Sequence, residues 1–131
     1  MNKHSRGFTV IELLIIVLIL GAASVLFFIQ KSNIEVAARD DQRKTAINSM
    51  YYSLEEVFFK ANGFYPLTIS ETNLPSVDPA VFTDPGGIKI GTANSDYRYE
   101  PVNCTDEKCK SYTLRATLES EADFVKNNKS S

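Results

Sequence analysis

The sequence predicts an α+β protein, in which one long N-terminal α-helix packs on a small antiparallel β-sheet. Residues 8–61 contain no proline and only one glycine, so that little in this stretch would break a helix. Residues 96–102 and 110–118 alternate apolar or aromatic with polar side chains, which is typical of strands. A length of 131 residues allows one compact domain in addition to a membrane segment.

The first part of the predicted helix is apolar over the length of a membrane span. Residues 13–29 contain no ionisable side chain, and residues 8–11 extend the stretch to roughly the 20 residues that a helix needs to cross a bilayer. Glu12 is the one charged residue inside it. A carboxylate in hydrocarbon costs about 2.5–3.5 kcal/mol on insertion scales, which makes Glu12 a candidate functional residue. The alternative is that Glu12, near the end of the span, reaches the interface or takes a proton.

The charges that flank the span predict its orientation. Lys3 and Arg6 precede the span, and the next charge, Lys31, lies beyond it. By the positive-inside tendency, the N-terminus stays in the cytoplasm and the C-terminal domain is exported. The alternative is a secretory signal peptide cut near Ala23, where small residues cluster. The acidic Glu12 and the apolar residues that follow the cluster argue against that alternative.

The short basic leader before the span ends in a glycine. If the chain is cut after Gly7, Phe8 carries a cationic amine four residues before Glu12. When such helices stack, the amine of one subunit can neutralise Glu12 of its neighbour. A buried pair of this kind is poor evidence for stability, but it is a plausible device for setting the register between helices.

The stretch Gly7-Phe8-Thr9-Val10-Ile11-Glu12, followed by the apolar run, resembles the N-terminal signature of type IV pilins and of type II secretion and competence pseudopilins. The resemblance implies the pilin fold, cleavage between Gly7 and Phe8 by a prepilin peptidase, N-methylation of Phe8, and a need for Glu12 in assembly. Gly21 lies where many members have a glycine that loosens the helix. The proline that often follows is Ile29 here.

The second half of the predicted helix is amphipathic. Its charged start offers two pairs at the favourable i,i+4 spacing, Glu35 with Arg39 and Asp40 with Lys44. Apolar side chains then recur at three- and four-residue steps, as on the buried face of a helix; they are Ile47, Met50, Tyr51, Leu54, Val57, Phe58 and Ala61. The expected solvent face carries Asn48, Ser49, Glu55, Glu56 and Lys60. Gly63 is suited to end the helix.

These boundaries divide the chain into four parts. Residues 1–7 are the predicted leader, 8–30 the transmembrane or filament-core half of the helix, and 31–62 its amphipathic half. Residues 63–131 form the rest of a small globular domain, with a loop and a β-hairpin. A helix from Phe8 to Ala61 would be roughly 80 Å long, more than so small a domain can cover. Its N-terminal half must therefore be covered by lipid or by other copies of the chain.

Residues 70–94 are rich in turn signals and are expected to form a loop. Within it, Asp84-Pro-Gly86 resembles the Asp-Pro-x-Gly turn of pseudopilin relatives, where nearby acids can hold calcium. Asp78, Asp84 and Asp96 supply oxygens of the type that calcium prefers, but calcium takes six to eight oxygens and no dense acidic loop is present. We therefore expect solvated turn acids, with no metal site and no cofactor.

The two cysteines flank the short turn between the predicted strands. On an exported chain, Cys104 and Cys109 are expected to form a disulfide that closes a β-hairpin. A loop this short stabilises the fold by only about 2 kcal/mol, so the bond serves mainly to stiffen the exposed tip. The spacing is not that of a Cys-x-x-Cys redox motif. After Leu118 the chain turns polar, and residues 127–131 are expected to be frayed.

The composition argues against several other classes of function. The 14 basic and 16 acidic residues become 12 and 16 once the leader is removed, a side-chain balance of −4, whereas nucleic-acid binders are usually strongly basic. Two cysteines and one histidine do not make a zinc set. No nucleophile with a base is evident, so we expect no catalytic residues.

The sequence therefore favours a structural subunit of a type IV pilus-like filament, serving adhesion, twitching motility or DNA uptake. The resemblance implies as partners a prepilin peptidase, an assembly ATPase and an inner-membrane platform protein. The subunit would lie in the cytoplasmic membrane, with its C-terminus outside, before it joins an extracellular or periplasmic filament. Residues 62–66, Asn-Gly-Phe-Tyr-Pro, resemble a pseudopilin motif, so that a secretion or competence pseudopilin is the nearest alternative. The alternative of another class is a monomeric binding domain anchored by a single span.

Overall fold

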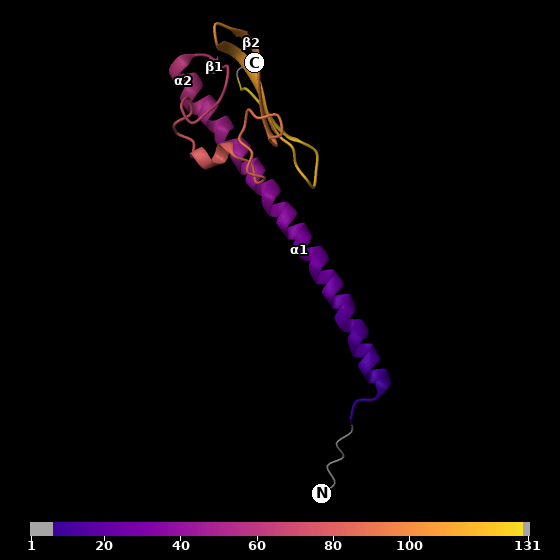
Figure 1. The fold of residues 1–131 in the computed structure, drawn as a ribbon. Coiled ribbons are helices and arrows are strands. Elements are labelled where there is room, and N and C mark those ends of the chain that lie inside the picture. Colours follow the sequence, from indigo (N-terminus) through magenta and orange to yellow (C-terminus); the bar gives the residue numbers. More distant parts are fainter. Residues whose placement is uncertain (1–6, 130–131) are drawn as a thin grey trace. The chain divides into compact units, whose positions relative to one another are not determined.

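The computed structural model describes residues 7–129 and has the predicted α+β architecture, one long helix packed on a small antiparallel sheet (Figure 1). The chain divides into two compact units, Met1–Glu35 and Val36–Ser131. In the described part of the first unit, the regular structure is the beginning of helix α1. The second unit contains the rest of α1, all the strands and the hydrophobic core.

The helix begins and ends close to the predicted residues. Helix α1 runs from Val10 to Tyr52 and passes through Gly21 without interruption. A π-helical segment, η1, covers Ser53–Phe58, and α2 covers Phe59–Asn62. Gly63 ends the helix in the left-handed conformation, with φ 77° and its N–H 2.7 Å from the carbonyl oxygen of Phe59. A glycine adopts this conformation without the penalty that a Cβ would bring.

The π-helical segment changes which face of the helix is buried. Ile47, Met50 and Leu54 are fully buried, as predicted. Beyond them the prediction is wrong for two residues, because Glu55 is only 5% exposed whereas Val57 is 44% exposed. Phe58 still packs against the core, as predicted. A π-turn accommodates one more residue than an α-turn, and the side chains that follow are therefore rotated relative to the α-helical pattern.

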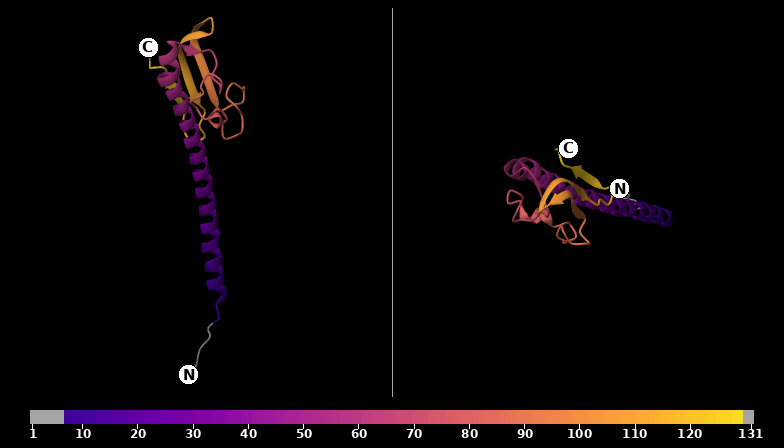
Figure 2. Two further views of the ribbon diagram at one scale, coloured as in Figure 1. Left: turned by 90° about the vertical axis from the view of Figure 1, so that its left-hand side faces the viewer. Right: turned by 90° about the horizontal axis from the view of Figure 1, so that it is seen from above.

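The sheet has β3, Lys108–Ala116, at its centre. On one side β3 pairs with β2, Tyr97–Thr105, to form the predicted antiparallel hairpin. On its other side it pairs with two short strands, β1, Tyr65–Pro66, and β4, Phe124–Asn127. Figure 2 shows the sheet lying along the part of the helix that belongs to the second unit.

The C-terminal segment is ordered as far as Lys129, contrary to the sequence prediction, and residues 130–131 lie outside the described part of the chain. Strand β4 pairs with β3 from Thr113↔Asn127 to Ala116↔Phe124. The backbone N–H of Lys129 then donates to Glu55 Oε1 at 3.0 Å. Frayed ends were expected because the segment is polar. The segment is held by hydrogen bonds to residues that are distant in sequence, in β3 and at Glu55.

The core of the second unit joins the helix, the loop and the sheet. Its side chains are mostly aliphatic and tyrosine residues that are less than a tenth exposed. They are Ala46, Ile47, Met50, Leu54, Tyr65, Ile69, Leu74, Val77, Phe82, Tyr97, Cys109, Tyr112, Leu114, Ala116 and Leu118. The predicted loop contributes to this core through a short 3₁₀ helix, η2, Pro79–Phe82, in which Phe82 is fully buried.

Candidate functional site: the apolar helix, its cap and the hairpin tip

The apolar side chains in the first half of α1 are exposed. None of the residues in the most apolar 18-residue window of the helix is buried, and the helix is long and apolar enough to cross a membrane. The exposed fraction of the large apolar side chains in this half of α1 runs from 39% for Ile16 to 77% for Val10. A contiguous apolar surface of this kind marks contact with lipid or with other protein chains.

A capping box marks the start of α1. The Glu12 N–H donates to Thr9 Oγ1 at 3.2 Å, and the Thr9 N–H donates back to Glu12 Oε2 at 2.9 Å. Two backbone donors that the helix cannot satisfy are paired in this way, and such a cap is worth about 0.5–2 kcal/mol. The Thr-x-x-Glu spacing of this box is a local signal in the sequence, and it gives Glu12 a hydrogen-bonding role beside that of its charge. The carboxylate therefore has a partner within its own chain.

The predicted cleavage site lies just before this cap. Gly7 and Phe8 precede the first helical residue and are both exposed. A Cβ built on Gly7 would meet no atom within 4 Å, so nothing in the described chain covers this backbone. The bond between Gly7 and Phe8 therefore lies outside the helix, between two exposed residues. The charges Lys3 and Arg6, which predicted the orientation, lie outside the described residues.

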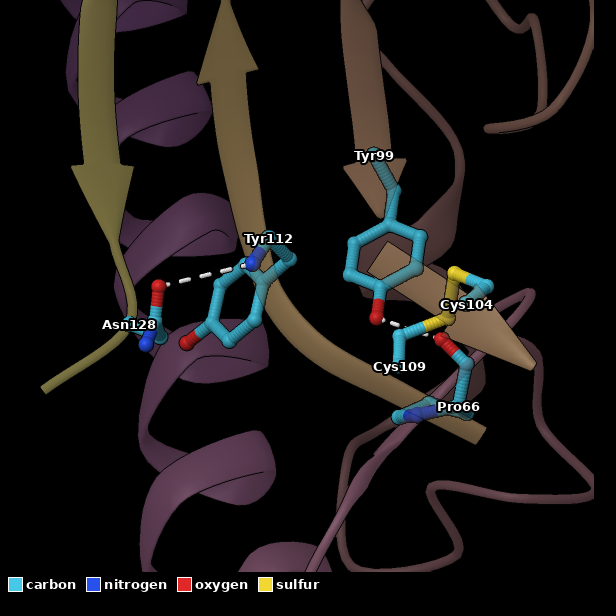
Figure 3. The surroundings of a disulfide bond; sticks show 6 residues. All are labelled: Pro66, Tyr99, Cys104, Cys109, Tyr112 and Asn128. Atoms are coloured by element: carbon cyan, nitrogen blue, oxygen red, sulfur yellow. Dashed lines mark hydrogen bonds between the residues drawn. A yellow bond between two sulfur atoms is a disulfide. The ribbon is translucent and has the colours of Figure 1, made fainter. Parts of the chain in front are cut away.

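The predicted disulfide is present at the tip of the β2–β3 hairpin (Figure 3). Cys104 and Cys109 face each other in register, with their Cα atoms 4.0 Å apart. The turn between β2 and β3 consists of Asp106 and Glu107, whose φ angles are 52° and 64°. Positive φ at both turn residues suits the twist of a two-residue hairpin, although Asn-Gly is the usual sequence there.

Tyrosine side chains connect the hairpin to the rest of the second unit, close to the disulfide. Tyr99 Oη donates to the carbonyl oxygen of Pro66 at 2.6 Å, which ties β2 to β1 (Figure 3). The Tyr112 N–H donates to Asn128 Oδ1 at 3.4 Å and holds the chain that follows β4. Cys109 is 1% exposed, whereas Cys104 is on the surface. One end of the disulfide is therefore anchored in the core.

The three candidate calcium ligands have different surroundings. Asp78 is exposed and caps η2, with Oδ1 accepting the Ala80 N–H at 2.9 Å. Asp96 Oδ2 lies 3.0 Å from Arg43 Nε. Asp84 is 4% exposed, so the expectation of a solvated side chain is wrong for this residue. Within residues 7–129, no group of three or more potential ligand side chains is placed to hold a metal ion.

Comparison with known proteins gives no family. No family model, no curated protein and no solved structure matches this chain. The function must therefore be inferred from the uncovered apolar helix, the residues around its cap and the disulfide-closed hairpin.

An ion-pair network built on the buried side chains of Asp40 and Arg43 ties the helix to the segment after β3. Arg43 Nη1 lies 2.8 Å from Asp40 Oδ1 and 2.6 Å from Glu119 Oε2. Arg39 forms two further hydrogen bonds to Glu119, and Lys44 pairs with Glu121. Asp40 is bonded across the fold rather than to Lys44, so the predicted i,i+4 pair is not the contact that forms.

The network changes the acidity of its carboxyl groups. Burial raises the pKa of Asp40, but donors from Glu119, Ser120 and Arg43 outweigh it and hold this pKa well below its usual range. The guanidinium groups of Arg39 and Arg43 lower the pKa of Glu119 to about 2. Both groups bind a proton more weakly in the folded than in the unfolded chain.

We therefore expect the second unit to lose stability in acid. A carboxyl group with a lowered pKa in the folded state stabilises the protein above its unfolded pKa, here 3.8 for Asp40 and 4.5 for Glu119. This contribution falls as the pH decreases through 4 towards about 2. Urea unfolding of the full chain in mild detergent, followed by near-UV circular dichroism, measures the effect. Asp40→Asn should be less stable at neutral pH and less sensitive to acid; an unchanged acid dependence in this variant would refute the assignment.

Proposed function

We propose that this chain is a structural subunit of a type IV pilus-like filament. It is processed between Gly7 and Phe8 and polymerises through the apolar half of α1. The observation that carries the proposal is the exposed apolar helix, with Glu12 in its first turn. The Gly7–Phe8 bond precedes this helix and lies between exposed residues. The Cys104–Cys109 hairpin and its domain would face outward.

Two environments can cover the apolar helix in turn. Lipid covers it before assembly, and neighbouring helices cover it in the filament. Because lipid tails are as apolar as leucine, moving the helix from lipid to protein gains little hydrophobic energy. The free energy of assembly must therefore come from close packing of the helices and from external work. This is consistent with the assembly ATPase and platform protein that the resemblance implies.

The single carboxylate inside this surface has a clear role in such an assembly. In the free subunit Glu12 accepts the Thr9 N–H. After cleavage, the new amine of Phe8 on a neighbouring subunit can neutralise it when the helices stack. Each subunit would then take part in two such pairs. Its Phe8 amine would meet Glu12 of one neighbour, and its Glu12 would meet the Phe8 amine of another. Contacts of this head-to-tail kind extend without closing, and so generate filaments rather than rings.

A pseudopilin of a secretion or competence system is the second candidate. It is favoured by residues 62–66, in which Gly63 ends the helix and Tyr65–Pro66 begin the sheet as β1. Both candidates use the same processing and the same helix. They differ in the amount of filament: abundant fibres on wild-type cells favour a pilus, and fibres seen only on overexpression favour a pseudopilus.

The proposal is tested by shearing fibres from cells and labelling them with an antibody against the Val36–Ser131 unit. Labelled fibres along their whole length are expected. A chain that stays monomeric in the membrane at every expression level, with no labelled fibre, would favour the membrane-anchored binding domain instead.

A further inference from the structure

Asp84 is a buried carboxyl group that connects two ends of the loop before the sheet. Its Oδ1 accepts the Ile88 N–H at 2.9 Å, and its Oδ2 accepts the Asp96 N–H at 2.8 Å. The backbone of Asp84 also pairs with that of Ile88 and accepts the Gly87 N–H, both at 2.9 Å. One side chain thus closes the 84–88 turn and fixes the residue that leads into β2.

The contact with Asp96 extends this arrangement to the helix. Asp96 donates its N–H to Asp84 and places its own Oδ2 3.0 Å from Arg43 Nε, which is buried on α1. The turn, the start of β2 and the helix are therefore joined by one chain of hydrogen bonds. Within the turn, a Cβ on Gly86 would lie only 3.3 Å from Asp84 Oδ1, so a glycine there leaves room for this carboxylate.

These contacts do not fit a calcium site. Calcium needs six to eight oxygen ligands whose lone pairs are free to face it. Both oxygens of Asp84 face N–H donors, and the Asp96 carboxylate faces the guanidinium of Arg43. A divalent cation between these groups would have to displace the donors and approach a fixed positive charge.

We infer that the carboxyl group of Asp84 organises this loop from inside the protein, so that the loop does not depend on a divalent cation. The N–H groups of Ile88 and Asp96 bind this carboxyl group, whereas in the related turns the resemblance implies that calcium can bind the acids. The inference concerns the Val36–Ser131 unit alone, and it stands whether or not the chain polymerises.

The test compares thermal unfolding of the full chain in mild detergent with a chelator and with millimolar CaCl₂. The midpoint is expected to be the same in both. Asp84→Ala leaves two partly buried N–H groups without their acceptor and should lower the midpoint by about 10 °C in both solutions. Asp78→Asn, at an exposed cap in the same loop, is the matched control and should change it by about 2 °C or less.

A chelator that lowers the midpoint of the parent protein, with recovery on addition of CaCl₂, would overturn the inference. Hydrogen exchange of the parent chain gives a second readout that needs no variant. The Ile88 and Asp96 amides should be equally protected with and without calcium. Protection that appears only with calcium would likewise overturn the inference, even if Asp84→Ala fails to fold.

Discussion

Cells that carry Glu12→Ala are expected to insert the chain into the membrane normally and to yield at least about a hundredfold fewer fibres. Removing one partner of a buried ion pair leaves the other charge uncompensated, which costs about 3–5 kcal/mol per contact. In the proposed filament that charge is the amine of Phe8 on the neighbouring subunit. The amount of chain in sheared fibres, relative to the amount in membranes, measures the effect.

Two further variants separate the charge of Glu12 from its capping contact. Glutamine also serves in a capping box, so Glu12→Gln keeps an acceptor for the Thr9 N–H but removes the charge. It should fail to assemble, as Glu12→Ala does. Thr9→Val removes the hydroxyl that accepts the Glu12 N–H and keeps the carboxylate, so it should still form fibres. Normal fibres from Glu12→Gln would show that the cap matters and the charge does not.

Glu55→Ala is expected to destabilise the second unit by about 3–5 kcal/mol. Glu55 is buried, and its carboxyl group accepts three donors from separate parts of the chain. They are Tyr65 Oη at 2.9 Å, Tyr112 Oη at 2.8 Å and the Lys129 N–H at 3.0 Å. The variant removes all three of these hydrogen bonds and opens a cavity beside the donors.

The adjacent Glu56 provides a matched control. It is more exposed and pairs with the side chains of Lys60 and Lys129. Surface ion pairs contribute about 1 kcal/mol or less, so Glu56→Gln should have a small effect. Urea unfolding of the full chain in detergent, followed by the near-UV signal of the buried tyrosines, measures both variants. Equal losses of stability in the two variants would contradict the role assigned to Glu55.

The elements that local signals encode were predictable. Gly63 ends the helix because only the glycine takes the left-handed conformation there without strain, and the cysteines lie opposite each other because the hairpin register is set by its short turn. The capping box at Thr9 and Glu12 is encoded just as locally by its Thr-x-x-Glu spacing, whereas the charge of Glu12 alone does not indicate it.

The features that long-range contacts create were not predictable from the pattern. The π-helical segment turns Glu55 inward, and its partners include a residue 74 positions later in the sequence. Strand β4 is short and only half apolar, and it forms because β3 offers an unpaired edge. Asp40 meets Ser120 across 80 positions, so the helical i,i+4 rule could not find its partner.

The mass and the first residue of the mature chain decide whether the protein is processed as a prepilin. The chain should be purified from shed fibres or from its native membrane and measured intact. We expect a chain that begins at Phe8 and is heavier by one methyl group. A chain that begins at Met1 would point to the membrane-anchored domain, and one that begins near Ser24 would indicate a signal peptide; either result would contradict the filament role of Glu12.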